Sequence, residues 1–373
     1  MEPMPSRGSA DSPIQVLVVD DSAVVRQVMT AVLSRERDMA VSVAADPIIA
    51  MQKMKQARPD VILLDLEMPR MNGLTFLHKV MDEDPIPILI CSSVAAKGTN
   101  SALRSLDEGA MGIVTKPQLG VRDFLQDSAV ILINMVRSAA QADLRRPRHH
   151  AQTTKRIRSN SNSIRPRAAS SEQIVAIGAS TGGTEALTDI LTSLTPDVPG
   201  IVIVQHMPEG FTAAFASRLN GLCQIEVTEA VNGERFVAGH AYIAPGNRHT
   251  SLERNGGGYV IRVNDGPLVS RHRPSVDVLF QSVAECSGRN ALGVILTGMG
   301  NDGTTGMLAM KSAGARTVAQ DEESCVVFGM PREAIKAGAA EFVVPLARIP
   351  ELIHLHGSSS FGTRAQSSDS QHV

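Results

Sequence analysis

Short apolar runs alternate with helix-forming segments along most of this 373-residue chain, and this alternation restricts the folds open to it. Strands that alternate with helices predict a parallel sheet with helices on both faces. In the first third of the chain, helical periodicity marks residues 23–33 and 103–108, and the apolar runs are residues 14–19, 41–45, 61–64, 86–91 and 112–114. Residues 14–138 are therefore predicted to form one α/β domain with five parallel strands.

A second α/β region is predicted at residues 173–356. Its strand candidates are residues 174–177, 201–204, 225–227, 241–243, 259–263, 293–296, 317–319 and 342–344, and helix candidates follow Gly183, Phe211, Val276, Gly303 and Pro331. Residues 230–265 show few helical patterns and predict a β-hairpin insertion. This region is therefore predicted to form a doubly wound, mostly parallel sheet with that insertion.

A basic stretch separates the two regions. Residues 145–167 hold eight Lys and Arg and no Asp or Glu, with polar residues between them. Low hydrophobicity with charge of one sign predicts a flexible linker over residues 139–172, although a basic linker can also contact an acidic surface or RNA. The Ser-rich residues 357–373 predict a disordered tail.

Composition narrows the classes of function. The formal net charge of -2 gives no general attraction to nucleic acid, and 3% aromatic residues without Trp do not provide a base-stacking surface. No apolar run reaches the roughly 20 residues that span a bilayer, and the first residues lack the apolar centre of a signal peptide. The four cysteines are far apart, without metal-ligand spacing. We therefore expect a cytoplasmic protein without nucleic-acid binding or membrane insertion.

Acidic and hydroxyl residues end the predicted strands of the first region. Asp20 and Asp21 follow the first strand, Asp65 the third and Ser92 the fourth, while Lys116 follows the fifth. The carboxyl ends of parallel strands meet at one edge of a sheet. Clustered carboxylates suit Mg²⁺, beside which an aspartate can attack a phosphoryl group. The Asp pair by itself could equally cap the helix that follows.

The first region resembles a two-component receiver domain over nearly its whole length. The matching motifs are residues 18–22, 63–69, 72–73, 92–93 and 116–117. The resemblance implies a flavodoxin-like fold with phosphorylation at Asp65 and Mg²⁺ held by Asp20, Asp21 and Asp65. It also implies a phosphorylation switch that involves Ser92 and Lys116.

Three strands of the second region end at residues that suit hydrolysis. Ser180, His206 and Asp302 each follow a short apolar run that predicts a strand. If these strands are neighbours, they bring a nucleophile, a base and an orienting acid to one edge of the sheet. Residues 178–182 also satisfy G-x-S-x-G, a sharp turn that exposes a nucleophilic serine. The order Ser, His, Asp differs from that of α/β-hydrolases, so the motif does not bring that fold with it.

Each of these residues also has a plainer interpretation. The glycine-rich loop could cradle a phosphate, although no Lys follows its glycines. His206 could be a structural histidine at a sheet edge, and Asp302 could cap a helix. His272, between two arginines, suggests a substrate contact or a structural role, and Thr181 is placed to lend a hydrogen bond.

The second region resembles the catalytic domain of chemotaxis protein-glutamate methylesterases (the CheB family) across almost its full length. The motifs that carry the resemblance are residues 177–183, 205–208, 243–246, 273–277 and 296–303. The resemblance implies Ser180 as nucleophile, His206 as general base and Asp302 as its orienter. It also implies an oxyanion site near Thr181 and the Met299 backbone. An N-terminal receiver domain is this family's architecture, so the two resemblances agree.

Together the resemblances imply a phosphorylation-activated hydrolase that serves adaptation in chemotaxis-type signalling. It would demethylate glutamate methyl esters and deamidate glutamines on a methylated chemoreceptor, with a chemotaxis-type histidine kinase as phosphodonor. Mg²⁺ would serve the receiver, and the esterase reaction would need no cofactor. Two alternatives remain, a response regulator whose output binds nucleotide or nucleic acid, and an adaptor with an inactive triad.

Overall fold

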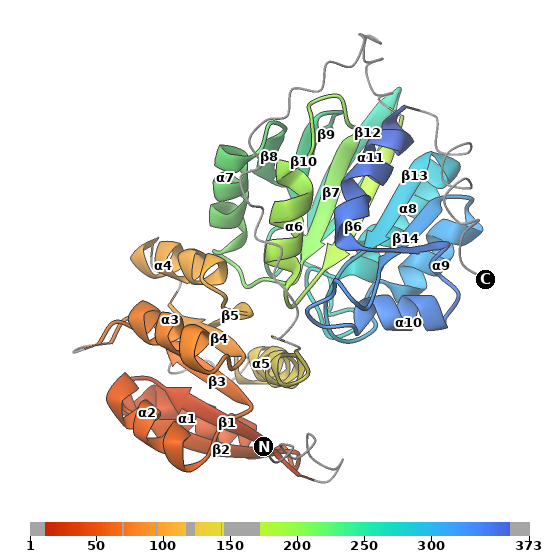
Figure 1. Ribbon diagram of the computed structural model, residues 1–373. Coiled ribbons are helices and arrows are strands. Elements are labelled where there is room, and N and C mark those ends of the chain that lie inside the picture. Colours follow the sequence, from red (N-terminus) through yellow and green to blue (C-terminus); the bar gives the residue numbers. More distant parts are fainter. Residues whose placement is uncertain are drawn as a thin grey trace, which may run out of the picture. The chain divides into compact units, whose positions relative to one another are not determined.

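The computed structural model describes residues 12–68, 71–93, 96–116, 124–142, 144 and 172–358. The chain divides into two compact units between residues 142 and 143, and each is described by itself (Figure 1). Most of the predicted basic linker, residues 145–171, lies outside the described residues, as does the tail from residue 359. The predicted limits 14–138 and 173–356 therefore stay predictions.

The first unit contains a five-stranded parallel sheet in the order β2-β1-β3-β4-β5. The strands are β1 (Ile14–Val19), β2 (Met39–Ala44), β3 (Val61–Asp65), β4 (Ile88–Ser92) and β5 (Gly112–Thr115). The helices are α1 (Ala23–Leu33), α2 (Pro47–Gln56), α3 (Gly73–Glu83), α4 (Ala96–Asp107) and α5 (Phe124–Ala140). This architecture confirms the predicted α/β class and the number of strands.

Capping side chains explain where two helices of the first unit begin. Ser22 accepts a hydrogen bond from the Val25 backbone N–H at the start of α1. Asp46 does the same for Ile49 at the start of α2. Such side chains satisfy backbone N–H groups that lack a partner within the helix. Ser22 is the N-cap of α1, and its own N–H donates to Asp20 Oδ1 at 2.8 Å, at the end of β1.

The second unit contains a seven-stranded sheet in the order β15-β14-β13-β6-β7-β10-β8, whose pairings are all parallel. Its strands are β6 (Ile174–Ala179), β7 (Gly200–Gln205), β8 (Glu226–Glu229), β10 (His240–Ile243), β13 (Ala291–Ile295), β14 (Arg316–Gln320) and β15 (Phe342–Val344). A separate antiparallel sheet holds β9 (Arg235–Phe236), β11 (His249–Asn255) and β12 (Gly258–Asn264). The predicted doubly wound, mostly parallel sheet is confirmed.

The hairpin of the second unit is narrower than the predicted insertion at residues 230–265. Strands β11 and β12 form the hairpin, and β9 pairs with β12. Strand β10 instead joins the parallel sheet between β7 and β8. All four of its residues are buried there. Strand β11 was not among the predicted strands because the second half of its sequence is polar and exposed.

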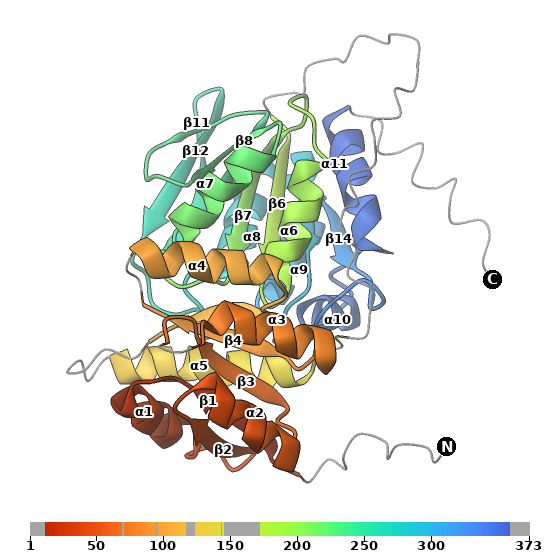
Figure 2. The same cartoon turned by 60° about the vertical axis from the view of Figure 1, so that its left-hand side comes forward.

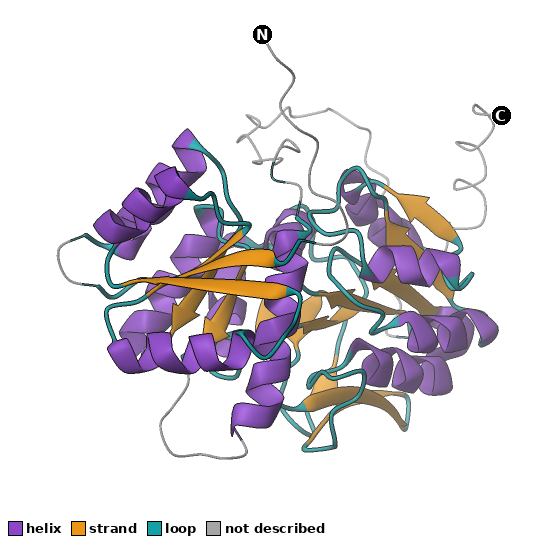
Figure 3. Cartoon of the chain, turned by 90° about the horizontal axis from the view of Figure 1, so that it is seen from below, coloured by secondary structure: helices purple, strands orange, loops and turns teal. Residues whose placement is uncertain are grey.

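Helices cover both faces of the seven-stranded sheet. On one face lie α6 (Gly183–Thr192), α7 (Thr212–Leu222) and α11 (Ile349–Gly357), as Figures 1 and 2 show. On the other lie α8 (Val276–Ser287), α9 (Thr304–Ser312) and α10 (Met330–Lys336). Figure 3 shows the same helices and strands coloured by secondary structure. Among the helices of the described ranges, none is long and apolar enough to cross a membrane.

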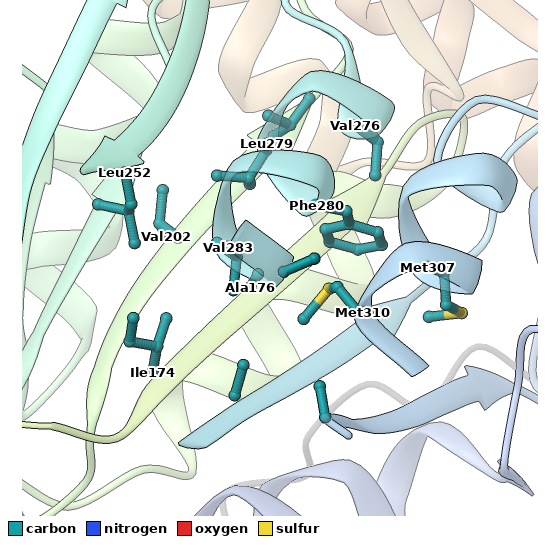
Figure 4. Packing of buried hydrophobic residues seen from close by; sticks show 14 of the residues in the cluster. Ile174, Ala176, Val202, Leu252, Val276, Leu279, Phe280, Val283, Met307 and Met310 are labelled. Atoms are coloured by element: carbon teal, nitrogen blue, oxygen red, sulfur yellow. The ribbon is translucent and has the colours of Figure 1, made fainter. Parts of the chain in front are cut away.

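The core beneath the sheet fixes helix α8 against strand β6. Phe280 and Val283 of α8 pack with Met307 and Met310 of α9 in a fully buried cluster (Figure 4). Burying each such side chain contributes about 1.5–3 kcal/mol. A Cβ at Gly178 would lie 2.3 Å from Val276 Cγ1, so only glycine lets the first turn of α8 approach β6 this closely.

Candidate active site

Ser180 lies at the point where the order of strands in the sheet reverses. From β6 the chain continues to β7 on one side, and β13 pairs with β6 on the other. Ligands of open α/β sheets bind at the carboxyl ends of strands at such a switch point. Ser180 is the first residue after β6, and its N–H donates to Thr297 O at 3.0 Å, beyond the end of β13.

A tight turn presents Ser180 between β6 and α6. The Gly183 N–H donates to Ser180 O at 2.8 Å and closes the turn. Gly182 has a φ of 78°, a left-handed conformation that favours glycine. On the facing loop, a Cβ at Gly298 would lie only 2.6 Å from Ser180 Cβ. The glycines therefore set both the shape of the turn and the space around Ser180.

His206 occupies the matching position on the neighbouring strand. Ala179 and Gln205 are register partners at the ends of β6 and β7, and the His206 N–H donates to Ala179 O at 3.0 Å. Ser180 and His206 are thus the first residues past two adjacent strands. The prediction that the sheet edge brings them together agrees with this register.

Gln205 links Ser180 and His206 by hydrogen bonds, and sequence reasoning missed this residue. Its amide Nε2 donates to Ser180 O at 2.9 Å and to His206 O at 3.1 Å. The side chain is 3% exposed, so both bonds form away from water. A polar residue at the end of an otherwise apolar strand was the available signal.

Asp302 is the buried acid of the site, at 1% exposure. His206 Nε2 lies 2.8 Å from Asp302 Oδ2. Asp302 Oδ1 accepts the Ser275 hydroxyl at 2.7 Å, and the carboxylate also accepts the backbone N–H groups of Val276 and Asp277 at 2.8 and 3.1 Å. Asp302 therefore caps α8, whereas a capping role read from sequence would have placed it on α9, the helix that follows it.

These hydrogen bonds keep Asp302 ionised. Burial by itself would raise the pKa of Asp302, but the hydrogen bond and charge of His206, with His272 and Ser275, lower it to about 2. An ionised carboxylate needs a donor, so Nε2 of His206 carries the proton that points at Asp302. In the described part of the chain, His206 Nδ1 is buried and without a hydrogen-bond partner. Nδ1, which carries the lone pair, is therefore the basic atom of this ring.

His272 lies directly against the ring of His206. The imidazole rings of His206 and His272 stack with centroids 3.8 Å apart and an angle of 3° between their planes. Burial, followed by the charge of His206, lowers the pKa of His272 to about 3. Sequence reasoning placed His272 as a substrate contact or a structural residue, and the stack was not foreseen.

Thr181 and Met299 lie in the two loops that follow β6 and β13. Thr181 is 5% exposed, and its carbonyl accepts the Thr297 hydroxyl at 3.0 Å. Met299 is half-buried next to Gly298, the residue that packs on Ser180. Their part in an oxyanion site stays a prediction.

The first unit holds the predicted acidic cluster at its own sheet edge. Asp20 and Asp65 are buried, at 1% and 2% exposure, whereas Asp21 is exposed. Lys116 Nζ lies 3.1 Å from Asp20 Oδ2 and 2.6 Å from Asp65 Oδ2. Ser92 is buried at the end of β4, and its carbonyl accepts the Lys116 N–H at 3.0 Å. The five predicted positions thus meet at one edge.

The charges of this cluster suit a divalent cation. One carboxylate oxygen from each of Asp20, Asp21 and Asp65 lies within 4.8 Å of the others. Burial, partly offset by Lys116, raises the pKa of Asp20, and the charge of Asp65 raises it further. Three acids against one ammonium leave an excess of negative charge. Hard oxygen ligands with such a charge fit Mg²⁺.

Comparison with known proteins identifies both regions of the chain. Residues 16–126 match the response regulator receiver domain family, and residues 175–353 match the CheB methylesterase family. Protein-glutamate methylesterase/protein-glutamine glutaminase 5 of Anaeromyxobacter dehalogenans is 54% identical over 355 residues, which cover 93% of this chain and 98% of that protein. A protein of the same name, numbered 2, from Albidiferax ferrireducens is 55% identical over 341 residues, 89% of this chain and 97% of its own.

One solved structure is similar to part of this chain. The crystal structure of the Thermotoga maritima CheB methylesterase catalytic domain is 41% identical, with a TM-score of 0.48, and covers 49% of this chain and 97% of that one.

Proposed function

The chain belongs to the family of protein-glutamate methylesterases/protein-glutamine glutaminases, and from this premise we propose that Ser180, His206 and Asp302 carry out the hydrolysis. One observation supports this assignment above the others. The bond between Asp302 and Nε2 leaves His206 Nδ1 without a partner, and His206 directly follows Gln205, the register partner of Ala179 that precedes Ser180. That is the arrangement a general base needs beside a nucleophile.

In the proposed acylation step, His206 Nδ1 takes the proton of Ser180 Oγ while that oxygen attacks the carbonyl carbon of a glutamate methyl ester. Asp302 stabilises the imidazolium that forms, because it is ionised and bonded to Nε2. The C–O bond to methanol then breaks, and His206 returns its proton to the departing methoxide. The product is an acyl-enzyme on Ser180.

Deacylation repeats these steps with water. His206 takes a proton from water, the hydroxide attacks the acyl carbon, and the proton goes to Ser180 Oγ as it leaves, which releases the glutamate side chain. A glutamine substrate follows the same path with ammonia as the leaving group. We place the oxyanion near Thr181 and the backbone of Met299, where N–H donors at a helix start would stabilise developing negative charge.

Activity is proposed to be raised by phosphorylation at Asp65. A histidine kinase of the chemotaxis type would donate the phosphoryl group, and Asp20, Asp21 and Asp65 would hold Mg²⁺. When bound, Mg²⁺ would supply positive charge that offsets the charge of the phosphoryl group. Lys116 would pair with the phosphoryl oxygens, and Ser92 would donate its hydroxyl to them, because both lie at the same edge as Asp65.

The proposed setting is the cytoplasm, where the methylated chemoreceptor would be the substrate in adaptation. Residues 14–138 are proposed as the receiver domain and 173–356 as the catalytic domain. Residues 139–172 are then a flexible linker and residues 357–373 a disordered tail. Limited proteolysis of the full chain, with the fragments identified by mass, tests these limits.

Methanol release from a methylated receptor fragment tests the proposal, measured with and without acetyl phosphate and MgCl₂. Ser180→Ala should lower turnover by about a millionfold, and Asp65→Asn should abolish only the increase caused by acetyl phosphate. Full activity in Ser180→Ala would contradict the assignment of the nucleophile. A rate that is indifferent to acetyl phosphate would remove the control and leave the esterase.

A further inference from the structure

A strained turn carries the ring that stacks on His206. Ser270 and Arg271 have φ values of 50° and 66°, in the left-handed region that residues other than glycine seldom occupy. Val269 and His272 close the turn, since each donates its N–H to the other's carbonyl, at 3.1 and 2.8 Å. Strain of this kind gathers at functional sites, where the surrounding structure holds it in place.

Neighbouring side chains hold this turn. The Ser270 hydroxyl donates to Asp277 Oδ2 at 3.1 Å, which ties the turn to the first residues of α8. Arg273 Nη1 donates to Gly266 O at 2.8 Å, and its Nη2 donates to Asn247 Oδ1 at 2.8 Å. The turn is therefore fixed on both sides of His272.

The turn also fixes the protonation of His272. Its Nδ1 lies 2.7 Å from Ser270 O, a carbonyl that can only accept, so Nδ1 carries the proton of the neutral ring. Burial, followed by the charge of His206, holds the pKa of His272 near 3. The ring that lies against His206 is therefore neutral near pH 7.

We propose that His272 is a positioning residue whose neutral ring, stacked on His206, favours the imidazolium that forms when His206 accepts the serine proton. The face of a neutral aromatic ring attracts a cation that lies over it. This attraction is absent while His206 is neutral and appears as the proton transfers, so it lowers the barrier instead of strengthening the ground state. The proposal rests on the proposed role of His206 as the base.

Within the part of the chain that the structure describes, few charged groups surround the two rings. His206 meets the Asp302 carboxylate at Nε2 and His272 on its face. His272 feels His206, Asp302 and the neighbouring Arg271, and Asp277 reaches it only through Ser270. Asp302 favours the imidazolium in every variant below, so a difference between variants reports on the stacked ring.

Two substitutions separate the ring face from the rest of the side chain. His272→Leu removes the aromatic face, and His272→Phe keeps a flat ring that cannot titrate. His240 stacks on Tyr242 at 4.0 Å and 3° in another part of the unit, so His240→Leu is a matched control. The measurement is methanol release by the full chain from pH 5 to pH 9, with kcat and kcat/KM taken separately.

His272→Leu is expected to lower kcat about 3- to 30-fold and to move the acidic limb of the kcat/KM profile to lower pH, because the imidazolium of His206 loses support. His272→Phe should keep kcat within about threefold of the parent and keep the acidic limb in place. His240→Leu should change neither. Equal losses in the Leu and Phe variants, or an unmoved limb in His272→Leu, would overturn the proposal.

A second variant decides the matter if His272→Leu does not fold. Ser270→Ala keeps His272 but removes the hydroxyl that ties the turn to Asp277, so a smaller shift of the limb in the same direction is expected. No shift in Ser270→Ala would then count against the proposal. Ser180→Ala in the same assay separates the two questions. Loss of activity there, with unshifted limbs in the His272 variants, keeps the esterase and discards only the role of the stack.

Discussion

Asp302 and Asp277 form reciprocal hydrogen bonds between helices α8 and α9, each accepting backbone N–H groups from the first turn of one of them. Asp302, which precedes α9, accepts the backbone N–H groups of Val276 and Asp277 at the start of α8. Asp277, on α8, accepts the Gly306 N–H of α9 at 2.8 Å. The acid of the proposed triad is thus also a structural clamp between two packed helices.

Asp302→Asn should therefore damage both chemistry and stability. An amide cannot hold His206 in the required tautomer, and we expect kcat to fall by roughly 10⁴. The buried N–H groups of α8 lose a charged acceptor, which should cost about 1–3 kcal/mol in the free energy of unfolding. The chain has two tyrosines and no Trp, and both tyrosines, Tyr242 and Tyr259, are buried in the second unit. Thermal unfolding followed by tyrosine fluorescence therefore reports on this unit.

Asp277→Asn is the matched control for Asp302→Asn. It weakens the reciprocal cap on α9 but leaves the carboxylate on His206 untouched. We expect a similar loss of stability with activity within about tenfold of the parent. Equal losses of activity in the two variants would show that the clamp, and not the charge beside His206, governs turnover.

Gly298→Ala should disturb the nucleophile directly. The added Cβ would lie 2.6 Å from Ser180 Cβ and 2.5 Å from Met330 Sδ, so one of them must move. Overpacking of this kind costs about 1–3 kcal/mol, and a displaced Ser180 should reduce kcat at least tenfold. Gly257→Ala, in the β11–β12 turn with nothing within 4 Å, should leave kcat and stability unchanged. A Gly298→Ala variant with parental kcat would contradict the close packing of this loop on Ser180.

Gln205→Leu tests the link between the two strand ends. Leucine has nearly the same size but cannot donate to Ser180 O and His206 O, which are left with fewer partners in a buried site. We expect a loss of about 1–3 kcal/mol in stability and a lower kcat with little change in KM. A change in KM with kcat preserved would place Gln205 at the substrate instead.

Acid should destabilise the second unit in two stages. Burial lowers the pKa of His240, His272 and His356, so the unfolded chain binds their protons first, and stability falls as the pH drops below about 6.5. Each such histidine contributes at most about 1.4 kcal/mol per pH unit. Asp302, with its pKa lowered to about 2, adds a loss that begins only near its unfolded pKa of about 3.9.

Tyrosine fluorescence melts at pH 7.5, 6, 5 and 4 measure this slope. His272→Phe removes one of the titrating groups and should flatten the decline between pH 6.5 and 4. An unchanged slope in this variant would mean that His272 is not buried in its neutral form.

Mg²⁺ binding to the full chain should weaken in acid. Burial raises the pKa of Asp20, so as the pH falls Asp20 is protonated at a higher pH than an ordinary aspartate. The cluster then loses one negative charge. Isothermal titration with MgCl₂ at pH 7.5 and pH 5 measures the loss of affinity. Asp20→Asn should bind weakly and show a smaller difference between the two pH values. Parental affinity in Asp20→Asn would exclude Asp20 as a ligand.

Much of this fold was predictable because it depends on patterns of single residues. The central strands of the two parallel sheets are short and almost wholly apolar, and their ends carry the polar residues that meet at the sheet edge. Parallel pairing then makes a residue after one strand a neighbour of the residue after the next, as with Ser180 and His206. That rule needs no knowledge of side-chain conformation.

The parts that were missed depend on side-chain geometry. The stack of His272 on His206 arises from a left-handed turn at Ser270 and Arg271, where a sequence would normally signal such a turn with glycine or asparagine. The bond from Ser275 to Asp302 joins residues 27 positions apart on two loops. Neither contact leaves a mark in local periodicity, so neither could be predicted.

The position of β6 in the centre of its sheet has a consequence for synthesis of the chain. Ser180 and His206 leave the ribosome before Asp302, which follows His206 by 96 positions. Pairings of such long range form late, because the intervening chain must be ordered first. If Ser180, His206 and Asp302 act together as proposed, the nascent chain holds the serine and the histidine before the acid that orients the histidine has joined them. The site is complete only when β13, the strand before Asp302, has paired with β6.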